Sequence, residues 1–196
     1  MGSYSEPALP WDVFVWGSTT KMFTAASILQ LVERGLVGLE DPIFEHVDAM
    51  LPGDATLTTA VVTADARVAD VTVRMCLHMT SGLGDYDGEA YGAAQFAQRG
   101  RDFSPIDILL GGFVPTALSF APGARQQYCS TNYVLLGLVA ARYDGANATA
   151  QGAWRGFDQL SVARSTRAQL NTSKFVDAGE SPHTLPPYPV SSLECV

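Results

Sequence analysis

Apolar residues gather in two long runs, separated by stretches that are richer in glycine, proline and polar residues. The first run, over residues 18–34, puts apolar side chains on nearly every face of a helix, and such a helix is usually buried inside a domain. Glu33 and Arg34 end this helix in solvent, and Gly35 suits a left-handed stop. The second run, Thr131–Arg142, predicts another apolar helix.

Shorter elements are predicted between these two helices. Residues 52–70 predict a surface excursion, and an apolar segment over 71–83 closes on a glycine turn. Residues 84–102 predict a loop with one short helix. Pro105–Phe113 predicts a further helix, with Ser104 as its N-cap.

Both ends of the chain contain several prolines, which predict irregular structure over residues 1–10 and 182–189. Trp11–Trp16 is a short apolar run that we expect to be extended. No internal repeat or obvious linker divides the chain. We therefore expect one partial domain over residues 1–142, and residues 143–196 carry no assignment.

Composition narrows the possible functions. The 196 residues are 47% apolar and 16% charged, which is typical of a globular protein. The formal net charge of −8 argues against nucleic acid as a partner, because phosphate binding needs basic patches. No apolar run is long enough for a membrane span, and no secretory signal is visible, so localisation and oligomeric state stay open.

Cysteine and histidine positions argue against a metal site. Cys76, Cys129 and Cys195 show neither C-x-x-C pairing nor a histidine at zinc spacing. Their odd number indicates no complete disulfide framework, although two of them could pair in an exported protein.

Ser18 and Lys21 lie three residues apart at the start of the first predicted helix. Positions three apart share one helix face, so the serine hydroxyl and the lysine amine can meet. A serine hydroxyl needs a base to take its proton, and burial lets an amine act as that base. This spacing predicts a nucleophile and its base. A surface helix with Ser18 as N-cap is the alternative, but it does not explain a lysine followed by apolar residues on all faces.

Tyr128 precedes the second predicted helix, after the Pro122-Gly123 turn. A phenol in this position can project into a cleft and pass a proton to a leaving group, provided that a nearby cation lowers its pKa. Taken alone, Tyr128 is explained at least as well as an aromatic residue of the core or its rim.

Together these segments resemble the serine β-lactamase-related proteins, which include class C β-lactamases, D-Ala-D-Ala carboxypeptidases and related esterases. Residues 17–42 resemble their first active-site motif, Ser-x-x-Lys. Residues 77–83 resemble the structural segment that follows it, and Tyr128–Leu136 resembles the Tyr-x-Asn motif with its helix. The three segments follow one another in the family's order.

The resemblance implies an α+β fold, a helical lobe packed on an antiparallel sheet, with the sheet incomplete in this chain. It implies a serine hydrolase that forms an acyl-enzyme with an amide, a β-lactam or an ester. Ser18 is then the nucleophile, and Lys21 and Tyr128 act as general base and acid. Ser130 stands where the family often has Asn, and it is expected to bind the substrate. The expected partner is a small-molecule or short-peptide acyl substrate, with no cofactor and no metal.

One motif of the family is not found. The family carries a Lys- or His-Thr/Ser-Gly triplet on a strand that forms part of the oxyanion hole, and the nearest match here, His183-Thr184-Leu185, lacks the glycine. The family also has strands before its serine motif, whereas 17 residues precede Ser18. We therefore expect a fragment, an incorrect gene model or a degenerate copy.

Two other interpretations stay open. A non-catalytic or truncated relative could serve as a binding or scaffold domain, and an acylating probe would distinguish it from an enzyme. An unrelated helical interaction protein would explain the helices, but it would leave the ordered motifs and the lysine of the first helix unexplained.

Overall fold

A computed structural model describes residues 16–50, 65–144, 174–175 and 192–193. Its helical elements are η1 (Gly17–Thr20), α1 (Lys21–Glu33), α2 (Ile43–Asp48), η2 (Ala66–Asp70), α4 (Val73–Leu77), α5 (Glu89–Ala97), α6 (Pro105–Leu110) and α7 (Thr131–Asp144). The strands are β1 (Lys174–Phe175) and β2 (Ser192–Leu193).

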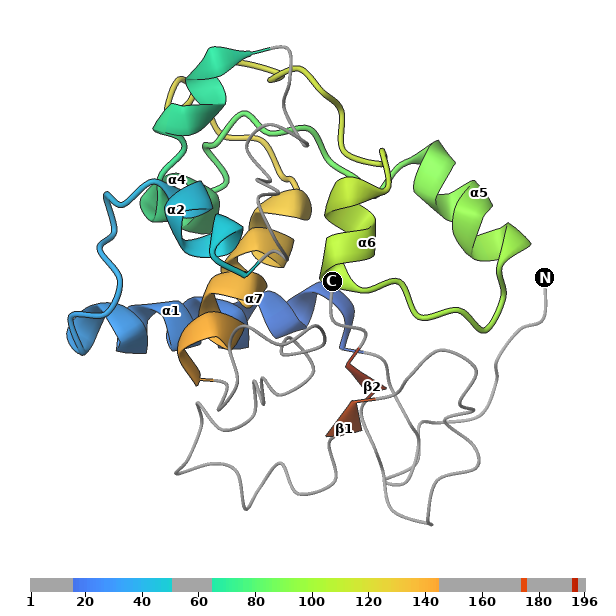
Figure 1. The fold of residues 1–196 in the computed structure, drawn as a ribbon, viewed down its shortest axis with the longest axis horizontal. Coiled ribbons are helices and arrows are strands. Elements are labelled where there is room, and N and C mark those ends of the chain that lie inside the picture. Colours follow the sequence, from blue (N-terminus) through green and yellow to red (C-terminus); the bar gives the residue numbers. More distant parts are fainter. Residues whose placement is uncertain (1–15, 51–64, 145–173, 176–191, 194–196) are drawn as a thin grey trace, which may run out of the picture.

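Helix α7 is the centre of the helical part. It packs against α1, α2, α4 and α6, and Figure 1 shows it crossing α1. Its side chains are buried on all faces, including Leu135, Leu136, Leu138 and Val139. Each fully buried aliphatic side chain contributes roughly 1.5–3 kcal/mol to the hydrophobic stabilisation. The prediction of an apolar helix at Thr131–Arg142 is confirmed.

Helix α1 is buried on one face in the described part of the chain, so the expected burial of this apolar helix is observed for that face. Ile28 and Leu31 are buried against the rest of the lobe, whereas Met22 and Leu29 are 63% and 49% exposed. The apolar residues surround the helix, but the described elements that pack on it cover a single side. The predicted end is confirmed, because Gly35 adopts φ +69° just after the helix.

Local signals predicted several short elements correctly. Ser104 caps α6 in a capping box: its hydroxyl accepts the Asp107 N–H at 3.0 Å, and the Asp107 carboxylate accepts the Ser104 N–H at 2.9 Å. The helix ends at Leu110 rather than Phe113, because Gly111 and Gly112 follow it. The extended run at residues 11–16 lies outside the described residues except for Trp16.

The predicted antiparallel sheet stays a prediction. In the part of the chain that the structure describes, the strands are β1 and β2, which pair in parallel over two residues each. The described residues thus give the helical lobe of the expected α+β fold.

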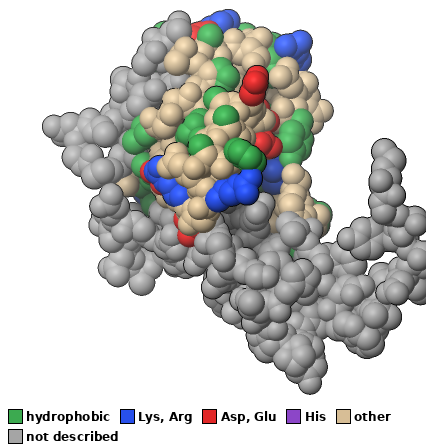
Figure 2. All heavy atoms as spheres, turned by 90° about the vertical axis from the view of Figure 1, so that its right-hand side faces the viewer, with side chains coloured by type: hydrophobic (Ala, Val, Ile, Leu, Met, Phe, Trp, Pro, Cys, Tyr) green, Lys and Arg blue, Asp and Glu red, His purple; other side chains and the backbone are tan. Residues whose placement is uncertain are grey.

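One face of the described part is mixed in character. Figure 2 shows the side that carries α5, on which apolar, acidic and basic side chains are interspersed. No helix in the described ranges is both long enough and apolar enough to cross a bilayer. Cys76 and Cys129 are buried free thiols, and Cys195 lies outside the described residues.

Candidate active site

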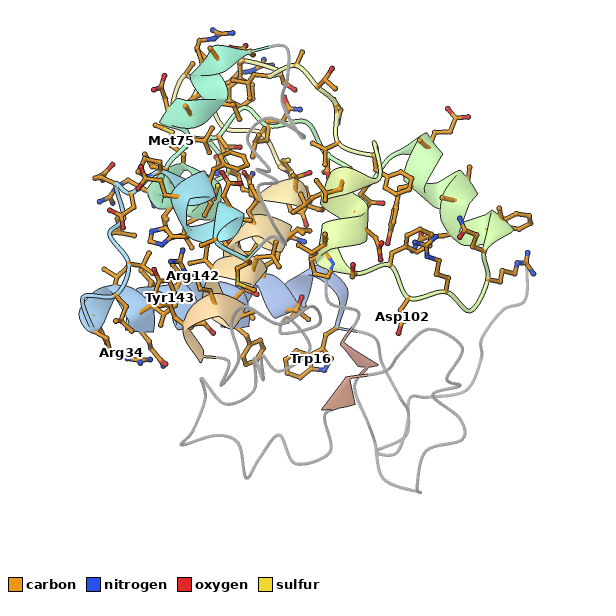
Figure 3. All side chains as sticks on the ribbon, viewed as in Figure 1. Trp16, Arg34, Met75, Asp102, Arg142 and Tyr143 are labelled. Atoms are coloured by element: carbon orange, nitrogen blue, oxygen red, sulfur yellow. The ribbon has the colours of Figure 1, made fainter. Side chains whose placement is uncertain are left out.

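Ser18 and Lys21 meet at the junction of η1 and α1. Ser18 lies in the 3₁₀ turn η1 and Lys21 is the first residue of helix α1, so the lysine side chain folds back over the turn. Lys21 Nζ donates a hydrogen bond to Ser18 Oγ at 3.3 Å. The N-cap position of η1 belongs to Trp16, which lies at this end of α1 in Figure 3. Ser18 therefore does not serve as the N-cap.

The Tyr128 hydroxyl reaches Ser18 from a distant part of the chain. Its oxygen lies 2.7 Å from Ser18 Oγ, and either oxygen can donate the proton. Ser18, Lys21 and Tyr128 thus lie together. Ser18 is exposed, Tyr128 is 55% exposed and Lys21 is half-buried, so the serine and tyrosine hydroxyls are open to solvent.

Backbone hydrogen bonds between two loops set the position of Tyr128. The N–H groups of Ser119, Gly123 and Gln127 donate to the carbonyls of Gly82, Thr80 and Met79, all at 2.8–2.9 Å. Residues 119–127 therefore run alongside residues 79–82. This pairing places Tyr128 next to Ser18. It also gives the segment that ends at Gly82 a structural role, since its carbonyls accept these hydrogen bonds.

The start of α7 is fixed by a buried threonine. The Thr131 hydroxyl donates to the Gly84 carbonyl at 2.8 Å and accepts the Tyr86 N–H at 3.0 Å. A buried hydroxyl with both a donor and an acceptor partner holds a single orientation. The first turn of α7, which begins three residues after Tyr128, is thereby tied to the segment at Gly84–Tyr86.

The surroundings of Tyr128 favour its anion. Burial by itself raises the pKa of Tyr128, but hydrogen bonds with Ser18 and Lys21, the charge of Lys21 and a hydrogen bond with Ser130 together lower it below the usual value. A phenol whose pKa is lowered by a cation is suited to exchange protons with a neighbouring hydroxyl.

Ser130 is buried and only 5% exposed. It is the weakest of the influences that lower the pKa of Tyr128. Its expected contact with a substrate stays a prediction.

Two neighbouring residues were not given a role by the sequence argument. Asn132 is fully buried, and its Oδ1 has no hydrogen-bond partner among the described residues, while its Nδ2 lies 3.5 Å from the Met79 sulfur. Tyr133 presents its ring to Lys21 Nζ, with the ring centroid 5.8 Å away. Both residues follow closely after Tyr128 in the sequence, and this position was the signal that could have placed them near the site. Only the structure shows which way their side chains point.

The described residues hold no group of three or more His, Cys, Asp or Glu side chains that could bind a metal ion. The chemistry that this arrangement offers is proton transfer to and from an exposed serine hydroxyl. That is the first requirement of an acyl-transfer site.

Known proteins resemble this chain in sequence and in fold. A family model described as Beta-lactamase matches residues 5–153. Penicillin-binding protein 4* of Bacillus subtilis (strain 168) is 31% identical over 138 residues, which are 68% of this chain and 26% of that protein. This chain thus spans about a quarter of that relative's length.

Two solved structures share the fold. One is a D-stereospecific amidohydrolase from a Streptomyces species, with 24% identity and a TM-score of 0.55, covering 81% of this chain and 42% of that one. The other is the D-amino acid amidase of Ochrobactrum anthropi SV3 complexed with L-phenylalanine, with 20% identity and a TM-score of 0.53, covering 87% and 41%.

Proposed function

Because this chain belongs to the Beta-lactamase family, we propose that it carries the nucleophile of a serine hydrolase that forms an acyl-enzyme with an amide, a β-lactam or an ester. The observation that carries the proposal is the hydrogen bonding of Ser18 Oγ, which has the Tyr128 hydroxyl at 2.7 Å and Lys21 Nζ at 3.3 Å. Two proton-exchanging groups on one exposed hydroxyl are suited to nucleophilic catalysis.

In the acylation step, Lys21 as a free amine or Tyr128 as a phenolate accepts the Ser18 proton. Ser18 Oγ then bonds to the carbonyl carbon, and the carbonyl oxygen becomes an oxyanion. The bond to the leaving group breaks, and the leaving nitrogen or oxygen takes a proton from the Lys21–Tyr128 pair. Ser18 is left as an ester, which completes the first half of the reaction.

In the hydrolysis step, a water molecule replaces the leaving group. The same pair accepts a proton from the water, whose oxygen attacks the ester carbon. The acyl–Oγ bond breaks, and Ser18 regains its proton as the acid departs. One pair of residues therefore serves both half-reactions with its roles reversed.

Covalent labelling tests the proposal. We expect a fluorescent penicillin or a fluorophosphonate to add one acyl or phosphonyl group to Ser18, detected by peptide mass spectrometry. Ser18→Ala should abolish the adduct, and Lys21→Ala should slow its formation by roughly 10²- to 10⁴-fold, because the hydroxyl loses a base.

Matched controls exist in the chain. Ser119 is an exposed serine outside the site, and Lys174 is the other lysine of the sequence. Ser119→Ala and Lys174→Ala should label at the wild-type rate. An adduct that survives Ser18→Ala, or the absence of any adduct on wild-type Ser18 after prolonged exposure to both probes, contradicts the proposal and favours a non-catalytic binding domain.

A further inference from the structure

The amine of Lys21 faces two aromatic rings. Its Nζ lies 5.3 Å from the centroid of the Tyr128 ring and 5.8 Å from the centroid of the Tyr133 ring. Cations are attracted to ring faces at separations up to about 6 Å. Tyr128 already has a role in the proposed reaction, whereas the Tyr133 hydroxyl points to a different part of the molecule.

The ring of Tyr133 is held firmly. Tyr133 lies in the first turn of α7, is 9% exposed, and donates its hydroxyl proton to the Leu77 carbonyl at 3.3 Å. Burial raises the pKa of Tyr133, so the ring remains a neutral phenol at physiological pH. A neutral ring anchored at its hydroxyl end presents a fixed face to Lys21.

The Tyr133 ring face matters because no described carboxylate forms a salt bridge with Lys21. An ammonium group formed at Nζ would therefore rely on the Ser18 and Tyr128 oxygens and on the two ring faces. A ring face stabilises a cation more strongly when both are partly withdrawn from water, which is the situation of half-buried Lys21.

We propose that Tyr133 is a positioning residue for the proposed reaction, and that its ring face holds the Lys21 amine against Ser18 Oγ and stabilises the ammonium formed there. The Ser18 O–H bond breaks, the proton bonds to Nζ, and the positive charge forms between the Tyr128 and Tyr133 rings. The proton later passes to the leaving group, and Nζ returns to the neutral amine. This inference rests on the proposed function.

The contact itself can be tested without any enzymatic activity. The sequence has two lysines, Lys21 and Lys174, so lysine labelled with ¹³C at the ε-carbon gives two NMR signals, and Lys21→Arg assigns them. Ring currents should shift the Lys21 ε-methylene signal upfield. Tyr133→Leu should remove much of that shift, Tyr133→Phe should preserve it, and the Lys174 signal serves as an internal reference in all three proteins.

The catalytic role can be tested with rings of nearly the same shape, and both of the rings compared lack the hydroxyl that bonds to the Leu77 carbonyl. Phenylalanine at position 133 keeps the negative ring face, and pentafluorophenylalanine keeps the shape but reverses the ring quadrupole. We expect the acylation rate constant with a fluorescent penicillin to change less than about threefold with phenylalanine. The fluorinated ring and Tyr133→Leu should slow it by about 2- to 30-fold. Binding of the probe before acylation should be unchanged.

The outcomes separate this inference from the proposed function. The inference is overturned if the Lys21 signal has the same chemical shift in Tyr133→Leu as in the wild type. It is also overturned if the fluorinated variant is acylated as fast as Tyr133→Phe. In both cases the labelling of Ser18 is unaffected. If the NMR shifts appear as expected but no variant forms a Ser18 adduct, the proposed function fails and the catalytic role of Tyr133 fails with it.

Discussion

At the scale of single residues, the Tyr128 hydroxyl lies among groups that all favour its anion. Ser18 and Ser130 offer hydrogen bonds and Lys21 adds positive charge, and together they outweigh the opposing effect of burial on the pKa of Tyr128. The pKa of this phenol is therefore lower in the folded protein than in the unfolded chain. A phenolate becomes more abundant as the pH rises through that lowered pKa.

This shift gives the acylation rate a predicted dependence on pH. If the Tyr128 phenolate takes the Ser18 proton, the rate constant for probe acylation should rise with pH, with its midpoint below 10, the ordinary value for tyrosine. Tyr128→Phe should remove this rise and slow acylation by roughly 10²- to 10⁴-fold. Rate constants measured between pH 6 and 11 would show both effects.

Tyr143, at the other end of α7, provides the control for that series. Tyr143→Phe should keep the wild-type pH profile, because this hydroxyl pairs with His46 rather than with Ser18. A rise that persists unchanged in Tyr128→Phe would assign the proton transfer to Lys21 alone.

The sequence predicted the residue pairs that local geometry determines. Ser18 and Lys21 are three positions apart, and a helical turn brings them together in almost any fold. The approach of Tyr128 depends on hydrogen bonds between two loops, so only the family resemblance pointed to it. The orientation of Tyr133 depends on its anchor at the Leu77 carbonyl, a contact between different elements that the sequence does not encode visibly.

At the scale of elements, the site depends on the close approach of the loop at residues 79–82 to residues 119–127. Gly82 lies in close contact with Phe120 in that approach. Its φ is +79°, and a Cβ at this position would collide with the Phe120 backbone carbonyl. Both the left-handed conformation and the lack of a side chain are therefore required there.

A pair of glycine substitutions can separate these two requirements. Gly82→Ala should lower the free energy of unfolding by about 2–5 kcal/mol, since it adds overpacking to the cost of a left-handed alanine. Gly100 also has a positive φ, +87°, but open space around it, so Gly100→Ala should cost about 1–2 kcal/mol. Urea denaturation measures both.

The two variants should also differ in their effect on the site. Gly82→Ala should slow acylation of Ser18, because the displaced loop moves Tyr128, whereas Gly100→Ala should leave the rate unchanged. Equal stability losses in the two variants would mean that the approach of Gly82 to Phe120 is looser than in the structure.

Elements with local signals were predicted well from the sequence. The N-cap at Ser104 and the glycine after α1 each involve neighbours in the chain, and both were predicted from the sequence. Burial was harder to predict, because the even distribution of apolar residues around α1 does not say which face is covered. The structure shows that Ile28 and Leu31 face the lobe and Leu29 does not.

At the scale of the whole molecule, α7 joins the site to the opposite end of the lobe. Its first turn carries Tyr133, and its last turn carries Arg142 and Tyr143, which Figure 3 shows near the far end of α1. His46 of α2 is buried between the Tyr143 hydroxyl at 2.9 Å and the Asp41 carboxylate at 3.0 Å. The Arg142 guanidinium donates a hydrogen bond to the His46 carbonyl, and this bond links α7 to α2.

The covered and open faces of α1 lead to the last prediction, which compares two leucines on one helix. Leu31 is 1% exposed against the lobe, and Leu29 is 49% exposed on the other side. Leu31→Ala should lower the free energy of unfolding of the 196-residue chain by about 2–5 kcal/mol, because it leaves a cavity. Leu29→Ala should change the free energy of unfolding by no more than about 0.5–1 kcal/mol, because this side chain is already half exposed and its truncation removes little buried surface. Helix propensity contributes equally to the two changes, so their difference in urea denaturation reports burial alone. Equal losses would show that a further part of the chain covers the outer face of α1, as the antiparallel sheet of the predicted α+β fold would.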